Sequence, residues 1–83
     1  MFITNSETKS DAIRKARIDF EGEKGQGVLP VSLMIRKYNS IPGGKTGYYF
    51  ADFCSMTFMD TSGYEYFEGQ DAIDLFKNPY NLK

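Results

Sequence analysis

The chain has 83 residues, which predicts a single domain over residues 1–83 and leaves no room for a second hydrophobic core. Its composition, 41% hydrophobic and 25% charged with a net charge of −1, is typical of a folded globular protein and excludes wholesale disorder. Histidine is absent and Cys54 is the single cysteine, so an internal disulfide and an ordinary structural zinc site are both excluded.

The location of the protein is predicted from three features of the sequence. The amino terminus lacks the basic segment followed by an apolar segment that is typical of a secretory signal peptide. The longest apolar run is far short of the ~20 residues needed to cross a bilayer. A single cysteine is typical of a reducing compartment. We therefore expect a cytoplasmic protein that does not associate with membranes.

The first structured segment carries two competing patterns. Ser10 or Asp11 can cap a helix over residues 8–15. Residues 16–21, ARIDFE, alternate apolar and charged side chains, which is the spacing of a strand. The sequence therefore predicts one or two helical turns that pass directly into a first strand.

Two glycine-rich loops separate the next expected strands. The segment GEKGQG, residues 22–27, has three glycines and no apolar side chain, so it predicts a hairpin loop. Residues 28–38 are a strand candidate in which Pro30, which cannot donate to a ladder, marks the start or an edge position. Residues 39–46 form the second loop, and residues 47–59, GYYFADFCSMTFM, are the longest strand candidate.

The segment over residues 47–59 is expected to be the central strand. Both of its faces are mainly apolar, and a strand that is apolar on both faces is normally covered on both. Asp52 is its only charge. This carboxylate is expected to pair with Arg36 or Lys37 across the sheet or to lie at a sheet edge, and a contact in a binding groove is the alternative.

The C-terminal part predicts a short strand and then a helix. DTSG at residues 60–63 is a tight turn that leads into a strand over residues 64–67. Residues 69–79 are expected to contain a helix. The positive charge of Lys77 is favourable near the negative C-terminal end of the helix, and Pro79 stops its growth. The expected fold is therefore α+β: a four-stranded antiparallel meander with this helix packed on one face. We expect the other face to be covered by the N-terminal segment or by a second copy, as a homodimer or partner interface.

Enzymatic activity is the least favoured class of function. Without histidine the chain lacks the commonest general base and the usual partner of a nucleophilic serine or cysteine. Cys54 lies in the middle of an apolar strand, where a buried and inert thiol is expected. Asp52 could form a carboxylate pair with Glu65 or Asp60, but no spacing singles out such a pair. We expect no catalytic residue, no metal site and no cofactor.

The segment GGKT at residues 43–46 resembles the end of a phosphate-binding P-loop only superficially. Asn39 stands where the first glycine of that motif is required. The motif must also lead into a helix, whereas here a strand is expected to follow. The segment is therefore interpreted as a glycine-rich hairpin loop with an exposed lysine.

Single-stranded nucleic-acid binding is the alternative function. Basic and aromatic residues occur together around one expected β-hairpin: Arg36, Lys37, Tyr38, Lys45, Tyr48 and Tyr49. Stacking rings beside a basic groove are the usual means of binding single strands. The isoelectric point near 5.3 argues against this function, because phosphate neutralisation normally supplies most of the affinity.

The favoured function is that of a protein-binding module. Tyrosines on neighbouring expected strands, surrounded by acidic residues, would form an aromatic patch with an acidic rim that suits a basic protein surface. The expected binding residues are Tyr48, Tyr49, Asp52, Phe53, Tyr64, Glu65 and Tyr66. In type, though not in any motif, the chain is similar to the small single-domain inhibitors that mobile elements encode. The expected function is therefore that of a non-catalytic inhibitor or regulator that binds another protein.

Overall fold

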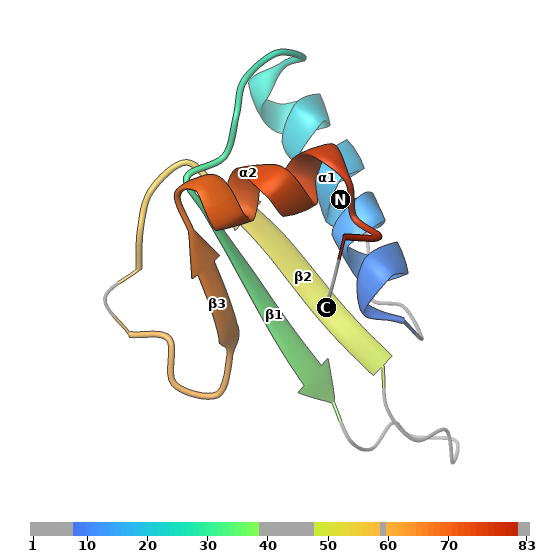
Figure 1. Ribbon diagram of the computed structural model, residues 1–83, viewed down its shortest axis with the longest axis vertical. Coiled ribbons are helices and arrows are strands. Elements are labelled where there is room, and N and C mark those ends of the chain that lie inside the picture. Colours follow the sequence, from blue (N-terminus) through green and yellow to red (C-terminus); the bar gives the residue numbers. More distant parts are fainter. Residues whose placement is uncertain (1–7, 39–47, 59, 82–83) are drawn as a thin grey trace.

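The computed structural model describes residues 8–38, 48–58 and 60–81 and has an α+β architecture. The elements in chain order are α1 (Lys9–Lys24), β1 (Ser32–Tyr38), β2 (Tyr48–Cys54), β3 (Glu65–Glu68) and α2 (Gln70–Lys77). The strands form an antiparallel sheet in the order β2-β1-β3, and both helices pack on the same face of it (Figure 1). In the described part of the chain this sheet has three strands, so the expectation of four is wrong.

The missing strand is part of α1, which is continuous through the segment where a helix followed by a strand was expected. The hydroxyl of Thr8 caps the helix by accepting a hydrogen bond from the Asp11 N–H at 3.2 Å. The buried residues of α1 recur at helical spacing: Ala12, Ile13, Ala16 and Phe20. Ile18, which strand alternation would place with its buried neighbours, is 44% exposed. The predicted strand over residues 16–21 is therefore wrong, because the helical stripe is the one that buries apolar surface.

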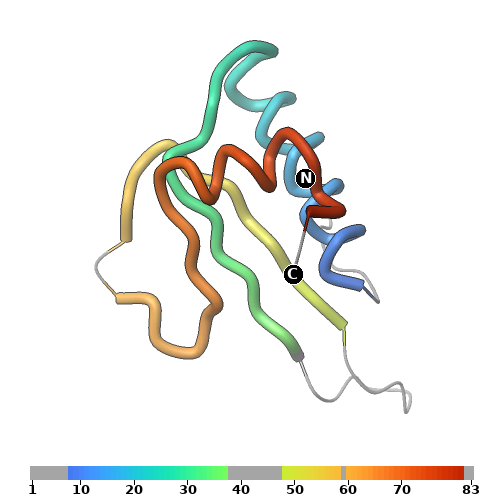
Figure 2. The backbone as a smooth tube through the Cα atoms, in the orientation of Figure 1, coloured from blue at the N-terminus to red at the C-terminus, as the bar shows by residue number. Residues whose placement is uncertain are grey.

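Residues 25–31 carry the chain from the end of α1 across the end of the sheet to β1, as Figure 2 shows. Gly25 ends the helix with a φ of 97°, and its N–H donates to the Glu21 carbonyl at 2.9 Å. The strand that was expected from residue 28 begins only after Pro30, at Ser32. Val31 is already bonded on both sides. Its N–H donates to the carbonyl of Cys54 in β2 at 2.8 Å, and its carbonyl accepts from the N–H of Gly69, the residue after β3, at 2.9 Å.

β2 is an edge strand, so the prediction of a central strand over residues 47–59 is wrong. β1 occupies the centre of the sheet, and β2 covers residues 48–54 of the expected range, whose end residues 47 and 59 lie outside the described part. On one side of β2, Ala51 and Phe53 are buried beneath the helices. The residues on the other side are half-buried. Both faces of β2 are therefore mainly apolar for different reasons. The helices cover one face, and the side chains on the other face are only half-buried.

The hydrophobic core lies between the two helices and one face of the sheet. Three rings meet there, Phe20 from α1, Phe53 from β2 and Phe76 from α2. They contact one another edge to face with centroid separations of 5.1 to 6.4 Å. Leu33 and Ile35 of β1 are buried beneath them. This cluster fixes both helices to the same face and leaves the opposite face without either of them.

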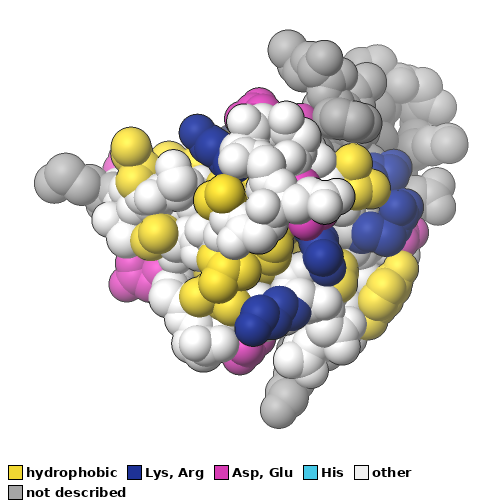
Figure 3. All heavy atoms as spheres, turned by 90° about the horizontal axis from the view of Figure 1, so that it is seen from above, with side chains coloured by type: hydrophobic (Ala, Val, Ile, Leu, Met, Phe, Trp, Pro, Cys, Tyr) yellow, Lys and Arg dark blue, Asp and Glu magenta, His cyan; other side chains and the backbone are white. Residues whose placement is uncertain are grey.

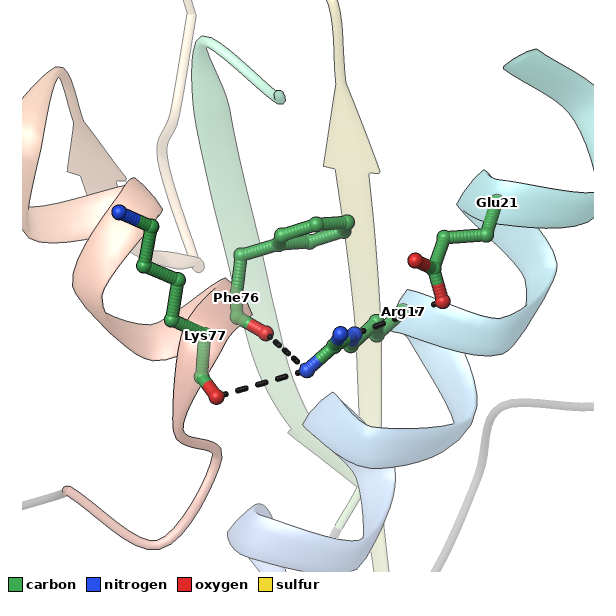
Figure 4. Close-up of polar contacts among 4 residues, drawn as sticks. All are labelled: Arg17, Glu21, Phe76 and Lys77. Atoms are coloured by element: carbon green, nitrogen blue, oxygen red, sulfur yellow. Dashed lines mark hydrogen bonds and ion pairs between the residues drawn. The ribbon is translucent and has the colours of Figure 1, made fainter. Parts of the chain in front are cut away.

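The predicted C-terminal helix is confirmed as α2, and Arg17 of α1 holds its end. The guanidinium Nη1 donates to the carbonyls of Phe76 and Lys77 at 3.1 and 3.4 Å (Figure 4). The same group lies 5.1 Å from the centroid of the Phe76 ring, and its Nε pairs with Glu21 at 3.4 Å. Because the last carbonyls of a helix lack intrahelical donors, Arg17 serves as a C-terminal cap supplied by another element.

The predicted turn over residues 60–63 is confirmed. The Asp60 carboxylate accepts from the Ser62 N–H at 3.0 Å, which lowers the pKa of Asp60, and the Tyr64 N–H donates to Thr61 at 3.0 Å. Gly63 has a φ of 80°, a conformation that favours glycine. The strand that follows, β3, begins one residue later than the sequence predicted.

Candidate functional site

The candidate site is the face of the sheet opposite the helices, which we call the open face. Successive strand residues point to opposite sides, so every second residue of each strand belongs to it. The cross-strand register aligns Asp52, Met34 and Tyr66 in one row, and Phe50 with Arg36 in another. The open face comprises Met34, Arg36, Tyr48, Phe50, Asp52, Cys54, Tyr66 and Glu68. Ser32 points to the same side but is buried, and its hydroxyl donates to the Met56 carbonyl at 2.6 Å.

Aromatic rings surround the β3 side of the open face. Phe58 and Tyr66 meet edge to face with centroids 6.4 Å apart, and the Phe58 N–H donates to the Tyr66 hydroxyl at 3.3 Å. That hydroxyl in turn donates to Glu68 at 3.2 Å. Arg36 lies with its guanidinium 5.6 Å from the ring centroid of Tyr64, which places Tyr64 at the border of the same face. The half-buried rings are therefore held in place while part of their surface stays accessible.

Asp52 is a half-buried carboxylate in the edge strand, on the open face. Its cross-strand partner is Met34, and among the described residues its carboxylate forms no ion pair. The expected pairing with Arg36 or Lys37 is therefore not made, and the expectation of exposure at a sheet edge is met only in part, since Asp52 lies in the edge strand but is half-buried. Burial raises the pKa of Asp52, and the nearby carboxylates of α1 raise it further.

Cys54 is half-buried at the end of β2, so the expectation of a buried thiol is met only in part. Its Sγ donates to the Asp52 carboxylate at 3.8 Å. Burial, and after it the negative charge of Asp52, raises the pKa of the thiol to about 11. The thiol is therefore protonated at neutral pH, which is opposite to the state that a nucleophilic cysteine requires.

The structure separates the seven expected binding residues into two groups. Tyr48, Asp52 and Tyr66 lie on the open face, with Tyr64 at its border. Tyr48 and Asp52 come from β2, and Tyr66 comes from β3, on the other side of β1. Tyr64 directly precedes β3. These four residues are the part of the predicted site that the fold brings to one surface.

The other three expected residues point to the helix side of the sheet. Phe53 is 4% exposed and belongs to the core. Glu65 forms an ion pair with Lys9 at 2.6 Å. The half-buried ring of Tyr49 lies 5.8 and 5.6 Å from the ammonium groups of Lys9 and Lys37. These residues are engaged in holding the elements together.

The residues of the nucleic-acid alternative are also divided. Arg36 belongs to the open face, whereas its neighbour Lys37 points to the helix side and lies over Tyr49. Tyr38 is the cross-strand partner of Tyr48 in the last pair of the ladder. Lys45 and the rest of the GGKT segment lie outside the described residues.

A pocket that the sequence did not predict lies at the C-terminal end of β2. Its volume is about 300 Å³, and it is lined by Glu23, Lys24, Asp52, Phe53, Cys54, Ser55, Met56 and Phe58. Glu23 and Lys24 were assigned to a hairpin loop from the sequence, and the structure places them in the last turn of α1. Only the length of that helix brings its acidic side chains to β2.

A second hollow lies between the start of α1, β3 and α2. Its volume is about 470 Å³, and it is lined by Lys9, Glu65, Phe67, Asp71, Asp74, Leu75 and Asn81. The Lys9–Glu65 ion pair lies in this hollow, and a hydrogen bond joins Gln70 to Asp74 at its rim. Three of its polar side chains, those of Lys9, Glu65 and Asp74, are therefore already paired within the fold.

Apolar side chains also reach the surface at the end of the molecule where residues 25–31 connect α1 with β1. Val28, Leu29 and Val31 are between 39% and 46% exposed, and Met56 is 66% exposed. Figure 3, seen from that end, shows hydrophobic side chains interspersed with lysine or arginine and with acidic side chains. The apolar surface there is broken by charges.

No group of three or more His, Cys, Asp or Glu side chains among the described residues could hold a metal ion. No helix in the described part of the chain is both long enough and apolar enough to cross a membrane.

In comparisons with known proteins, no family model matches the sequence, and neither a curated protein nor a solved structure matches the chain significantly. Function is therefore inferred from the site itself.

Proposed function

We propose that this chain is a non-catalytic protein-binding module that inhibits or regulates another protein by binding it through the open face. The observation that carries the proposal is the presence of half-buried rings, those of Tyr48, Phe50 and Tyr66, on a sheet face that neither described helix covers. Held aromatic rings with accessible surface are the commonest anchors of protein interfaces, because they bury much area at little cost in side-chain entropy.

The charges on the open face support a partner with a basic surface. Asp52 and Glu68 lie in adjacent rows of the sheet, and the only cation among the open-face residues named above is Arg36. Charged groups beside an aromatic centre guide the encounter and reject partners of the wrong charge. We therefore expect the partner to present basic side chains to this end of the face.

Two observations favour protein binding over the other classes of function. The raised pKa of the Cys54 thiol does not suit nucleophilic catalysis. Arg36 and Lys37 point to opposite sides of the sheet, so they do not form a joint basic groove for a phosphate backbone.

The test is affinity capture from lysate of the native host, with and without nuclease. The variant combines Tyr48→Ala, Tyr64→Ala and Asp52→Asn, and a matched control combines Tyr80→Ala with Asp71→Asn, two exposed positions away from the open face. We expect wild type and control to capture the same protein in the presence of nuclease and the open-face variant to lose it.

Circular dichroism shows whether each variant is folded. Unchanged capture by a folded open-face variant would contradict the proposal. Capture that nuclease abolishes, together with an electrophoretic shift of single strands that weakens with salt, would favour the nucleic-acid alternative instead.

A further inference from the structure

Within the described part of the chain, the outer edge of β2 is unpaired. This strand is the outermost on its side of the sheet, and β1 pairs with it along its full length. In an antiparallel edge strand, every second residue points its N–H and C=O away from the neighbouring strand. Among the described residues, none forms a backbone hydrogen bond to the outer side of residues 49–54. The sequence of β2 also contains neither the proline nor the lysine that commonly protect such edges.

The unpaired edge is acidic. Glu23 and Asp52 line one pocket, and the charges of both Asp19 and Glu23 add to the effect of burial in raising the pKa of Asp52. Asp19 and Glu23 are four residues apart in α1 and therefore share one flank of that helix. Lys24 also lines the pocket at this edge, so three negative charges and one positive charge leave a local charge of −2.

The pocket of about 300 Å³ lies at the C-terminal end of this edge. It is lined both by Phe53, which points to the helix side of β2, and by Asp52, which points to the open face. The pocket therefore lies where the edge reaches the C-terminal end of β2, between the last turn of α1 and the residues that follow the strand. Met56 and Phe58 supply apolar walls, and Glu23 and Asp52 supply the charge. A lysine or arginine side chain fits these walls, with its methylene stem against the apolar groups and its charge at the carboxylates.

We propose that the outer edge of β2 binds an extended, basic segment of a partner protein, which adds to the sheet as a further strand. Backbone hydrogen bonds to β2 hold the segment, and a lysine or arginine of the segment enters the pocket beside Asp52 and Glu23. This inference rests on the proposed protein-binding function and names the chemistry of the partner.

A second copy of the chain does not suit this edge. Pairing two β2 strands would bring both sets of three carboxylates, those of Asp19, Glu23 and Asp52, into a single interface. Like charges across paired strands oppose association. A basic segment instead supplies positive charge to the carboxylates of Asp19, Glu23 and Asp52, and charge complementarity therefore selects it as the occupant.

The probe is a capped heptapeptide, Thr-Lys-Val-Lys-Val-Lys-Thr, titrated into the ¹⁵N-labelled full chain and followed by amide chemical shifts. The matched peptide carries glutamate in place of each lysine. We expect the lysine peptide, at up to ~1 mM, to shift the amides of β2 and of the Asp19 and Glu23 flank of α1 and the glutamate peptide to shift none.

Two further peptides separate strand addition from simple charge attraction. Each is the lysine peptide with methylated backbone nitrogens, at the odd-numbered residues in one form and at the even-numbered residues in the other. Successive N–H groups of a strand point to opposite edges, so each form can pair through only one edge. We expect one form to bind and the other to lose binding, because a strand pairs with β2 through a single edge. Equal binding by both forms would overturn strand addition.

The variant Asp19→Asn with Glu23→Gln removes two charges of the edge and leaves the open face intact. We expect it to weaken binding of the lysine peptide by about threefold or more. The control, Asp71→Asn with Asp74→Asn on α2, changes the same number of charges and is expected to leave binding unchanged. No β2 shifts with the lysine peptide, or equal binding by wild type and edge variant, would overturn the inference.

Because Asp52 belongs to both surfaces, capture is also measured with Tyr48→Ala and Tyr64→Ala alone, and the two proposals can then fail separately. If open-face substitutions abolish partner capture but the lysine peptide does not bind β2, only the edge inference is lost. If the peptide binds β2 but open-face substitutions leave capture unchanged, the open face is not the binding surface and the edge inference stands.

Discussion

Asp52 and Cys54 point to the same side of β2 and influence each other's ionisation. Burial raises the pKa of both groups. The Asp52 charge then opposes thiolate formation at Cys54, while the hydrogen bond from the thiol partly offsets the rise in the pKa of Asp52. The carboxylate therefore lies in an environment that favours its neutral form, and a cation supplied by a partner would favour its charged form.

The first prediction concerns the reactivity of Cys54. With a pKa of about 11, about one thiol in a thousand is ionised at pH 8, against about one in ten for the ordinary value of 9.0. Only the thiolate reacts with iodoacetamide, so alkylation of Cys54 at pH 8 is expected to be roughly a hundredfold slower than that of a free thiol. Asp52→Asn should accelerate it several-fold, since the second-largest cause of the shift is removed. Mass spectrometry of timed reactions gives the rates, and a wild-type rate equal to that of a free thiol would contradict this account.

The second prediction concerns stability and pH. Because folding raises the pKa of Asp52 above 3.8, the folded protein binds this proton more tightly than the unfolded chain. The corresponding stability is present below pH 3.8 and is lost as the pH rises through the folded pKa. Asp52→Asn removes that loss, so the variant is expected to be more stable than wild type at pH 7, by on the order of 0.5 kcal/mol.

Urea unfolding of both proteins at neutral pH and at about pH 4 measures this difference. The advantage of Asp52→Asn over wild type should shrink at the lower pH. An advantage that is constant with pH, or that grows as the pH falls, would show that the Asp52 pKa is not raised in the folded protein.

At the scale of elements, the contact between the two helices depends on Arg17. Replacing it by methionine keeps an apolar stem near Phe76 but leaves two carbonyls of α2 without their donor. We expect Arg17→Met to lower the free energy of unfolding by about 1–2 kcal/mol. The control is Arg14→Met, whose exposed ion pair with Asp11 at 3.8 Å should cost less than about 0.5 kcal/mol.

Amide hydrogen exchange separates a local effect of Arg17→Met from a general one. The Asn78 amide, which donates to Asp74 at the end of α2, should exchange faster, with less change at amides in the first half of α1. Uniform acceleration along the chain, or equal effects of the two substitutions, would show that Arg17 does not cap α2.

The sequence predicted α2 well because its signals, such as Lys77 near its end and Pro79 after it, are local. It did not predict the full length of α1, because residues 16–21 fit both a strand and a helix. Ala16 and Phe20 are four residues apart. They share a face in a strand, where every second residue points to the same side, and also in a helix, where residues four apart lie one turn from each other. Only Ile18 distinguishes the two patterns, and its 44% exposure decides for the helix. The position of β2 at the edge depends on pairing between distant segments, and no local pattern specifies that.

The candidate site was predictable in part from the alternation of strand residues. Tyr48 and Asp52 share a parity and do lie together on the open face, whereas Tyr49 and Phe53 have the opposite parity and point to the helices. Grouping them as one surface ignored this alternation. Glu23 could not be found, because its approach to Asp52 follows from the unexpected length of α1.

At the scale of the whole molecule, the distribution of charge separates two surfaces that could each receive another chain. The β2 edge is acidic and opposes a second copy. The open face is different, because Asp52 and Glu68 lie in adjacent rows while Arg36 lies in the next row toward the other end of β1. A two-fold arrangement of two open faces can therefore place Arg36 of each copy against carboxylates of the other.

This arrangement yields the last prediction, which concerns self-association. In the absence of a partner we expect the chain to form a weak dimer through its open faces, so that its sedimentation coefficient rises with concentration above ~10 µM. Arg36→Glu and Glu68→Arg should each reduce the dimer, because each places like charges together, and the double variant should restore it by exchanging the two signs. Asp19→Asn with Glu23→Gln should leave sedimentation unchanged, since the β2 edge is not part of this interface. A chain that stays monomeric at all concentrations would remove the second copy as an occupant of the open face, and a different protein would then be the one that covers it.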